Sequence, residues 1–206
     1  MKKLILIFSA LILMSACSSQ TPTPAAVEKP QPKGPELVTA RTAVQKLYIT
    51  ARGWARDAQP YKVESQTTSE SRGQEGKSAI WQAGFASAAQ HGVKPYVWSG
   101  SAAPDAPSRG VNPGLEDSYS PTNSSTQVFD IAFLKIDSDK ALEVAQKHGG
   151  EKVMAKNPDL SIFYILDWNR STNELIWHVI YGPTRDQYKL RLAINATTGE
   201  FMRDEK

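Results

Sequence analysis

The chain has 206 residues, of which 40% are hydrophobic and 22% charged, with a formal net charge of +3. This length and apolar content allow one domain of upper-middle size or two small ones, with a real core. Its basic residues form no stripe of the kind that nucleic-acid-binding proteins carry, so no nucleic-acid partner is predicted. A single cysteine excludes a disulfide within the chain, so the core must hold the fold unaided.

The N-terminal segment has the layout of a secretory signal. Lys2 and Lys3 form a positively charged start, residues 4–14 are an apolar run, and small residues then lead to Cys17. Loss of the two lysines with the signal would reduce the formal charge from +3 to +1. The segment therefore predicts a signal peptide over residues 1–16 and a nearly neutral processed chain.

Met14-Ser15-Ala16-Cys17 resembles the lipobox of bacterial lipoproteins, with Met where Leu is commonest. The resemblance implies cleavage after Ala16 and lipid attachment at Cys17, which would anchor the protein in a lipid bilayer of the cell envelope. Because Ser18 follows the cysteine in place of a retaining Asp, enterobacterial sorting would imply the periplasmic face of the outer membrane. Plain secretion and a membrane-spanning helix are the alternatives, although a span needs about twenty apolar residues.

The signal is followed by two segments of different character, one extended and one helical. Residues 17–35 are rich in Ser, Thr, Pro and Ala and have little to bury, which predicts a disordered tether. From residue 36 to 58, apolar side chains recur at three- and four-residue spacing, which predicts an amphipathic helix. Pro35 suits its first turn and Pro60 ends it.

The middle of the chain predicts strands and one long loop. Weak alternation and β-formers favour strands over residues 61–69, 78–89, 96–99 and 128–136. The polar segment from Gly100 to Ser125 is long for a structureless loop in a compact domain. It is either a functional loop or a solvated insertion, and both interpretations stay open.

The last part of the chain has the clearest pattern. Asp137-Ser138 is a candidate N-cap, and Gly149-Gly150 is expected to stop the helix that follows. Three alternating strands are then predicted over residues 162–168, 175–181 and 189–196. Trp177 is in phase with its apolar neighbours, so we expect it to anchor the core.

This helix-and-three-strand unit resembles the PepSY domain. The resemblance is carried by Asp139-Lys140-Ala141, Trp177-His178-Val179 and Leu190–Glu200, where Asn195 replaces the usual Asp. PepSY domains accompany secreted peptidases and occur in cell-envelope proteins. The resemblance implies a binding or inhibitory role, with no shared catalytic residues to transfer.

The first half of the chain echoes the second. Ile80-Trp81 followed by residues 94–98 matches Ile176-Trp177 followed by residues 189–192, again after a helix. The predicted fold class is α+β, a helix packed on an antiparallel sheet, with one or two tandem helix-plus-three-strand units. The predicted domains are residues 36–127, with the long loop at 100–125, and residues 128–206.

The sequence carries no motif for catalysis, metal binding or cofactor binding. His91, His148 and His178 are the only histidines, and each has a structural or surface explanation. No nucleophile elbow, zinc motif or phosphate-binding glycine loop occurs. We therefore expect a protein that is not an enzyme and that needs no cofactor or metal.

The long loop supplies the candidate binding residues, because loops on a rigid scaffold concentrate function and aromatics dominate interfaces. The candidates within or beside it are Trp98, Arg109, Glu116, Asp117 and Tyr119. The predicted function is a non-enzymatic cell-envelope lipoprotein that binds a peptide or protein partner. An inhibitor or accessory of a secreted peptidase is the alternative.

Overall fold

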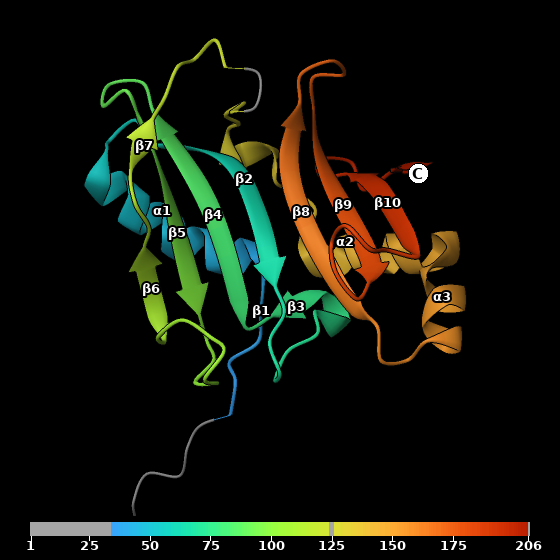
Figure 1. Cartoon of the computed structure of the whole chain (residues 1–206). Coiled ribbons are helices and arrows are strands. Elements are labelled where there is room, and N and C mark those ends of the chain that lie inside the picture. The colour runs from blue at the N-terminus through green and yellow to red at the C-terminus, as the bar shows by residue number, and fades with distance from the viewer. Residues whose placement is uncertain (1–33, 124–125, 206) are drawn as a thin grey trace, which may run out of the picture. The chain divides into compact units, whose positions relative to one another are not determined.

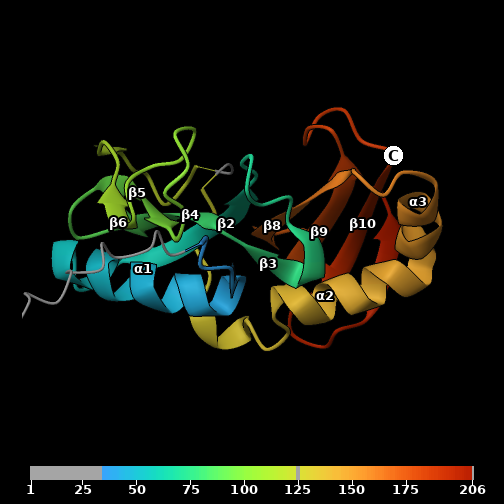
Figure 2. The same cartoon turned by 90° about the horizontal axis from the view of Figure 1, so that it is seen from below.

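The computed structural model describes residues 34–123 and 126–205. The predicted signal peptide, the lipidation site Cys17 and nearly all of the predicted tether lie outside these residues. Within the described part, helices cover one face of a nine-stranded antiparallel sheet (Figures 1 and 2). The predicted α+β class, a helix packed on an antiparallel sheet, is confirmed. None of the helices in this part is long and apolar enough to cross a membrane.

The first half of the fold contains one helix and most of the strands. Its elements are β1 (Val38–Thr39), α1 (Ala40–Trp54), β2 (Gln59–Gln66), η1 (Gln74–Gly76), β3 (Lys77–Ser78), β4 (Ile80–Ser87), β5 (Gly92–Ser99), β6 (Gly110–Pro113) and β7 (Asp117–Ser118). The helix begins at Ala40 because the two residues before it pair with β3. It ends where Ala55 becomes extended.

The second half continues with further helical segments and four strands. Its elements are η2 (Ile131–Phe133), α2 (Ser138–Ala145), η3 (Gln146–Gly150), α3 (Glu151–Lys156), β8 (Ser161–Asn169), β9 (Glu174–Gly182), β10 (Leu190–Asn195) and β11 (Phe201–Asp204). The three predicted strands of this half correspond to β8, β9 and β10.

Both halves place their elements in the same order. In each, a helix is followed by three antiparallel strands that are neighbours in the sheet, β2-β4-β5 and β8-β9-β10. The first strands of these two sets of three, β2 and β8, pair in the middle of the sheet, with Glu64 opposite Ile165. The sheet therefore runs through both halves, and the boundary predicted at residue 127 falls in the connection between them.

Two expectations about local structure are wrong. Residues 128–136 form no strand, because Phe129 and Leu134 turn into the core while Asp130 caps the short helix η2. The glycine pair does not end the helical region, which resumes as α3. Gly149 takes a left-handed φ of 117°, and Gly150 leaves room for the Tyr181 hydroxyl, which would lie 2.2 Å from an added Cβ.

The helices and the sheet enclose a single cluster of apolar side chains. The α1 residues in it, Ala40, Ala43, Val44, Leu47 and Ala51, are fully buried and follow the predicted helical spacing. Trp177 is also fully buried, which confirms it as a core residue. These side chains all lie on the helix side of the sheet. The residues that alternate with them on the opposite face include buried apolar side chains, such as Ile80, Ile176 and Ile180, as well as charged ones.

Candidate functional site

The predicted loop from Gly100 to Ser125 is partly ordered as sheet edge. Two short strands within it, β6 and β7, both pair with β5. Of the predicted binding residues, Trp98 is only 3% exposed, under the Lys46 ammonium, which lies 4.7 Å from its ring centroid. The expectation that Trp98 is an exposed binding aromatic is therefore wrong, because its strand position points it into the core.

The structure does not gather the other candidates into one site. Arg109 donates to the carbonyl of Gly34 at 2.9 Å. Glu116 accepts a hydrogen bond from the Trp54 indole at 3.0 Å, and Asp117 pairs with Val93 in the sheet. Tyr119, two residues further on, donates its backbone N–H to the His91 carbonyl at 2.8 Å. The last three candidates lie at the start of β5, whereas Trp98 and Arg109 lie near its end.

A different surface gathers more charged groups. We call the side of the sheet opposite α1 and α2 the open face; among residues 34–123 and 126–205, loops lie over it but no helix does (Figure 2). Its side chains alternate with the core residues along each strand. The charged ones form a row across the middle of the sheet, with Lys62 and Glu64 on β2, Asp167 on β8, His178 on β9 and Arg191 on β10.

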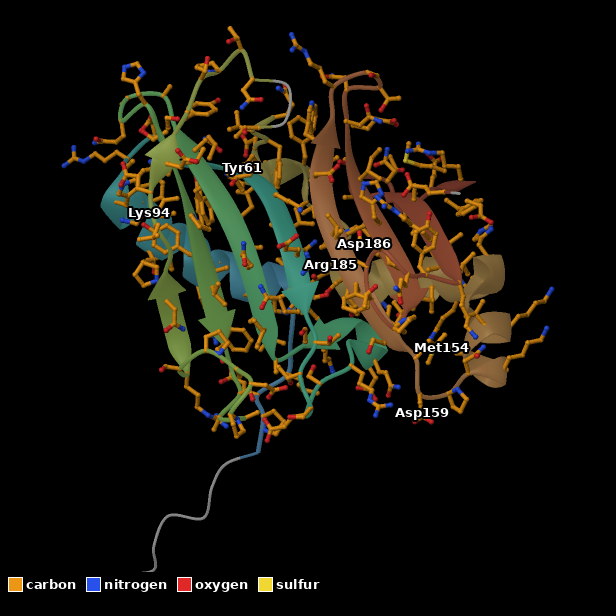
Figure 3. All side chains as sticks on the ribbon, in the orientation of Figure 1. Tyr61, Lys94, Met154, Asp159, Arg185 and Asp186 are labelled. Atoms are coloured by element: carbon orange, nitrogen blue, oxygen red, sulfur yellow. The ribbon has the colours of Figure 1, made fainter. Side chains whose placement is uncertain are left out.

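Glu64 is the centre of the first part of this row. Its carboxylate lies 2.8 Å from the Lys62 ammonium and 2.7 Å from the Arg185 guanidinium. Arg185 comes from the loop between β9 and β10, which reaches over β8 toward β2 (Figure 3). Its guanidinium also donates to the Ser65 carbonyl at 2.8 Å. Burial raises the pKa of Glu64, but Lys62 and Arg185 outweigh it and leave that pKa below its usual value.

His178 is the centre of the second part. Its Nδ1 lies 2.5 Å from the Glu205 carboxylate and its Nε2 lies 3.3 Å from Asp167. Burial lowers the pKa of His178, but the two carboxylates outweigh it and raise that pKa above 6.5. Burial raises the pKa of Glu205, whereas His178 and the Arg191 guanidinium, 2.9 Å away, lower it to about 2. His178 and Glu205 are therefore both charged over a range of mildly acidic pH.

Two cavities open on this face beside the paired strands β2 and β8. One, of about 260 Å³, is lined by Tyr61, Lys62, Glu64, Gln82 and Gly84. The other, of about 460 Å³, is lined by residues that include Asp167, His178, Arg170 and Gln127. Because Lys62 and Asp167 are register partners, the two cavities flank the same β2–β8 seam. An extended ligand crossing the seam could therefore contact both.

Tyr61 forms a wall of the smaller cavity because of a bulge in β2. The register shifts between Pro60 and Lys62, which leaves Tyr61 as an extra residue on the open face. Its ring covers Gly84 so closely that an added Cβ there would lie 2.4 Å from the ring. A glycine inside the strand sequence of β4 is the available signal for this close approach, but the bulge that uses it depends on strand pairing.

The described residues offer no assembled nucleophilic centre. Among residues 34–123 and 126–205, no histidine side chain hydrogen-bonds to a serine or threonine hydroxyl, and no group of metal-ligating side chains is close enough to hold an ion. His148 stacks on Phe201 with ring centroids 3.9 Å apart. The ionised groups of the charged row can form ion pairs and hydrogen bonds with a ligand.

Comparisons with known proteins bear on the fold. No family model matches the sequence, and no curated protein is detectably similar to it. The structure is similar to the crystal structure of a candidate lipoprotein from Clostridium difficile 630, with a TM-score of 0.53 and 9% identity. The likeness covers 79% of this chain and 91% of that one. The two chains therefore share an α+β fold of helices on an antiparallel sheet.

Proposed function

We propose that this protein is a lipid-anchored lipoprotein of the cell envelope, not an enzyme, that binds a peptide or protein partner on the open face of its sheet. The lipobox-like sequence ending in Cys17 supports the anchor. The structural neighbour, itself described as a candidate lipoprotein, is consistent with it. By resemblance to enterobacterial sorting, Ser18 favours the periplasmic face of the outer membrane.

One observation carries the binding role: four residues of the charged row line two neighbouring cavities, on a face that no helix of the described residues covers. Charged groups of both signs, half-buried and fixed by neighbours, give orientation and specificity to a partner with complementary charges. The PepSY resemblance of residues 137–200 favours the same class of role.

The anchor is tested by replacing Cys17. The parent protein should fractionate with the membrane and should yield an N-terminal peptide whose mass includes acyl chains. Cys17→Ser protein should lose both properties. A Cys17→Ser protein that remains in the membrane fraction, or a parent peptide without acyl mass, would overturn the lipoprotein assignment.

The binding face is tested by one substitution and a matched control. Gln82→Arg places a long cation in the smaller cavity, whereas Gln90→Arg makes the same change at an exposed turn between β4 and β5. Envelope pull-downs should lose a specific partner with Gln82→Arg and retain it with Gln90→Arg. A loop variant in which Arg109, Asp117 and Tyr119 are all changed to alanine should retain the partner as well. Loss only in the loop variant would move the site to that loop.

The alternative role as a peptidase inhibitor predicts a different partner. In that case the captured protein would be a secreted peptidase, and its activity would fall when the purified chain is added. A captured partner without peptidase activity favours the binding module.

A further inference from the structure

We propose that the exposed side of α1 is the surface on which the folded part of the protein rests against an anionic lipid bilayer. This inference rests on the lipid anchor of the proposed function, since the anchor would hold the domain close to a membrane. The binding site on the opposite side of the sheet would then face away from the bilayer.

The first argument is charge. The stretch from Val38 to Arg56 contains no acidic residue, and its cations are Arg41, Lys46, Arg52 and Arg56. The helical stretch of the other half, residues 138–156, instead mixes its lysines with acidic residues, namely Asp139, Glu143 and Glu151. The positive charge is therefore concentrated on α1, and basic segments of this kind are attracted to anionic lipid headgroups.

The second argument is the apolar surface between these cations. Ile49 lies in the middle of the outer side of α1 and is 75% exposed. Beside it, Tyr48, Ile131 and Leu134 line a mostly apolar groove of about 470 Å³. Phe133, on the same short segment, is 44% exposed. A basic surface with apolar side chains at its centre is the pattern by which helices lie at a membrane interface.

The acidic residues around this surface all have partners, and one of them, Glu36, pairs with an α1 cation. Glu36 pairs with Lys46 at 3.1 Å, and the Asp57 carboxylate accepts hydrogen bonds from Ser87 and Ala89. Asp130 and Asp137 accept hydrogen bonds from backbone N–H groups. Their charges reduce the local positive potential, but none of their carboxylates is paired with Arg52 or Arg56 within the part of the chain that the structure describes.

The connection to the anchor allows this placement. The described residues begin at Gly34 and lead directly into α1. Residues 18–33 separate Gly34 from Cys17, and a chain of that length reaches at most about 60 Å. A lipid on Cys17 would therefore keep α1 within reach of the membrane, where weak attraction is multiplied by the high local concentration of lipid.

The test places a reporter on α1 in the acylated full chain. Cys17 is the sole cysteine, so its acylation leaves an introduced thiol unique. Ile49→Cys and, on the open face, the control Asp186→Cys (Figure 3) are labelled with an environment-sensitive fluorophore. Both proteins are reconstituted into vesicles of phosphatidylethanolamine and phosphatidylglycerol, or of phosphatidylcholine alone, each carrying a nitroxide-labelled lipid as quencher.

The label at position 49 should be quenched in the anionic vesicles and quenched less in the neutral ones. The label at position 186 should be quenched in neither kind of vesicle. The paired change Arg52→Gln and Arg56→Gln should lower the ratio of docked to undocked protein, calculated from the quenching, about fivefold per charge removed. The matched pair Lys152→Gln and Lys156→Gln on α3 should leave it unchanged. Equal quenching at 49 and 186, quenching independent of lipid charge, or equal effects of the two pairs would overturn the proposal.

Failure of the anchor has its own readout. If the fluorophore attaches to Cys17 of the parent chain, that residue is not acylated and the lipoprotein assignment fails. The same labels on Cys17→Ser protein, added to preformed vesicles, then decide the α1 surface by the same criteria.

Discussion

Trp81 and Trp177 make the same hydrogen bond in the two halves of the molecule. The indole N–H of Trp81 donates to the carbonyl of Val38 at 2.9 Å, and that of Trp177 donates to the carbonyl of Ile136 at 2.8 Å. Each acceptor lies two residues before the first residue of a helix, α1 or α2. Each tryptophan lies on the middle strand of its set of three, β4 or β9, so the two bonds fix helix to sheet in the same way.

Loss of either indole N–H should therefore destabilise the fold by a similar amount. Trp81→Phe and Trp177→Phe each leave a carbonyl without its donor, at a cost of about 1–3 kcal/mol in the free energy of unfolding. Urea denaturation measures the change. As a control, Trp54→Phe removes an exposed hydrogen bond to Glu116 and should cost less than about 1 kcal/mol. A Trp81 variant as stable as the control would contradict the equivalence.

The spacing of apolar residues predicted the elements in which that spacing is regular. The helical spacing of α1 and the alternation of β8, β9 and β10 identified those segments and placed Trp177 in the core. The strand predicted at residues 128–136 failed because an apolar run fits a strand or a buried irregular segment equally well. Only the tertiary packing of Phe129 and Leu134 decides between them.

The candidate site was beyond reach of the sequence for a similar reason. Asp167 on β8 and Glu205, just after β11, meet His178 on β9 because all three side chains lie on the same face of the sheet. Arg185 meets Glu64 across two strands. Such contacts depend on strand order, which no local pattern encodes. The alternation did place His178 on the face opposite Trp177, and that was the one available signal.

Asp137 should matter more than an ordinary helix cap, because it caps two helices. Its carboxylate accepts the N–H of Ser138 at 2.7 Å at the start of α2 and the N–H of Arg41 at 3.0 Å in the first turn of α1. Asp137→Ala should lower the free energy of unfolding by about 2 kcal/mol. Asp130→Ala, which removes one bond at the short η2, should cost about half as much. Equal losses in urea denaturation would show that the bond to α1 contributes nothing.

The contact of Tyr61 with Gly84 should appear as a coupling between two substitutions. Gly84→Ala forces its Cβ into the Tyr61 ring and should cost about 1–3 kcal/mol in the free energy of unfolding. In a Tyr61→Ala background the ring is absent, so the same change should cost less than about 1 kcal/mol. A double-mutant cycle by thermal or urea unfolding measures the difference. Additive effects would mean that the ring does not rest on Gly84.

The pH dependence of stability should report the His178 cluster. His178 has a raised pKa in the folded state, so its contribution is complete below 6.5 and is lost as pH rises through the folded value. Glu205 has a lowered pKa, so its contribution is complete above 4.5 and is lost as pH falls toward about 2. The two contributions overlap between pH 4.5 and 6.5.

Unfolding free energy measured in urea at pH 5.5 and pH 8.5 should therefore fall with rising pH in the parent protein. His178→Gln should remove most of that fall. His148→Gln, which changes an exposed histidine stacked on Phe201, should leave it in place. A parent protein whose stability rises over this range, or equal slopes in the two variants, would contradict the ion pairs of His178.

The claim that the open face is the binding surface is tested most directly by photo-crosslinking in the cells that make the protein. Benzoylphenylalanine is placed at Gln82, in the smaller cavity, or at Lys152, exposed on α3 on the helical side. After irradiation, adducts are separated by mass and the attached protein is identified. We expect a discrete adduct from position 82 and none of the same mass from position 152. A discrete adduct from position 152 alone would contradict the account.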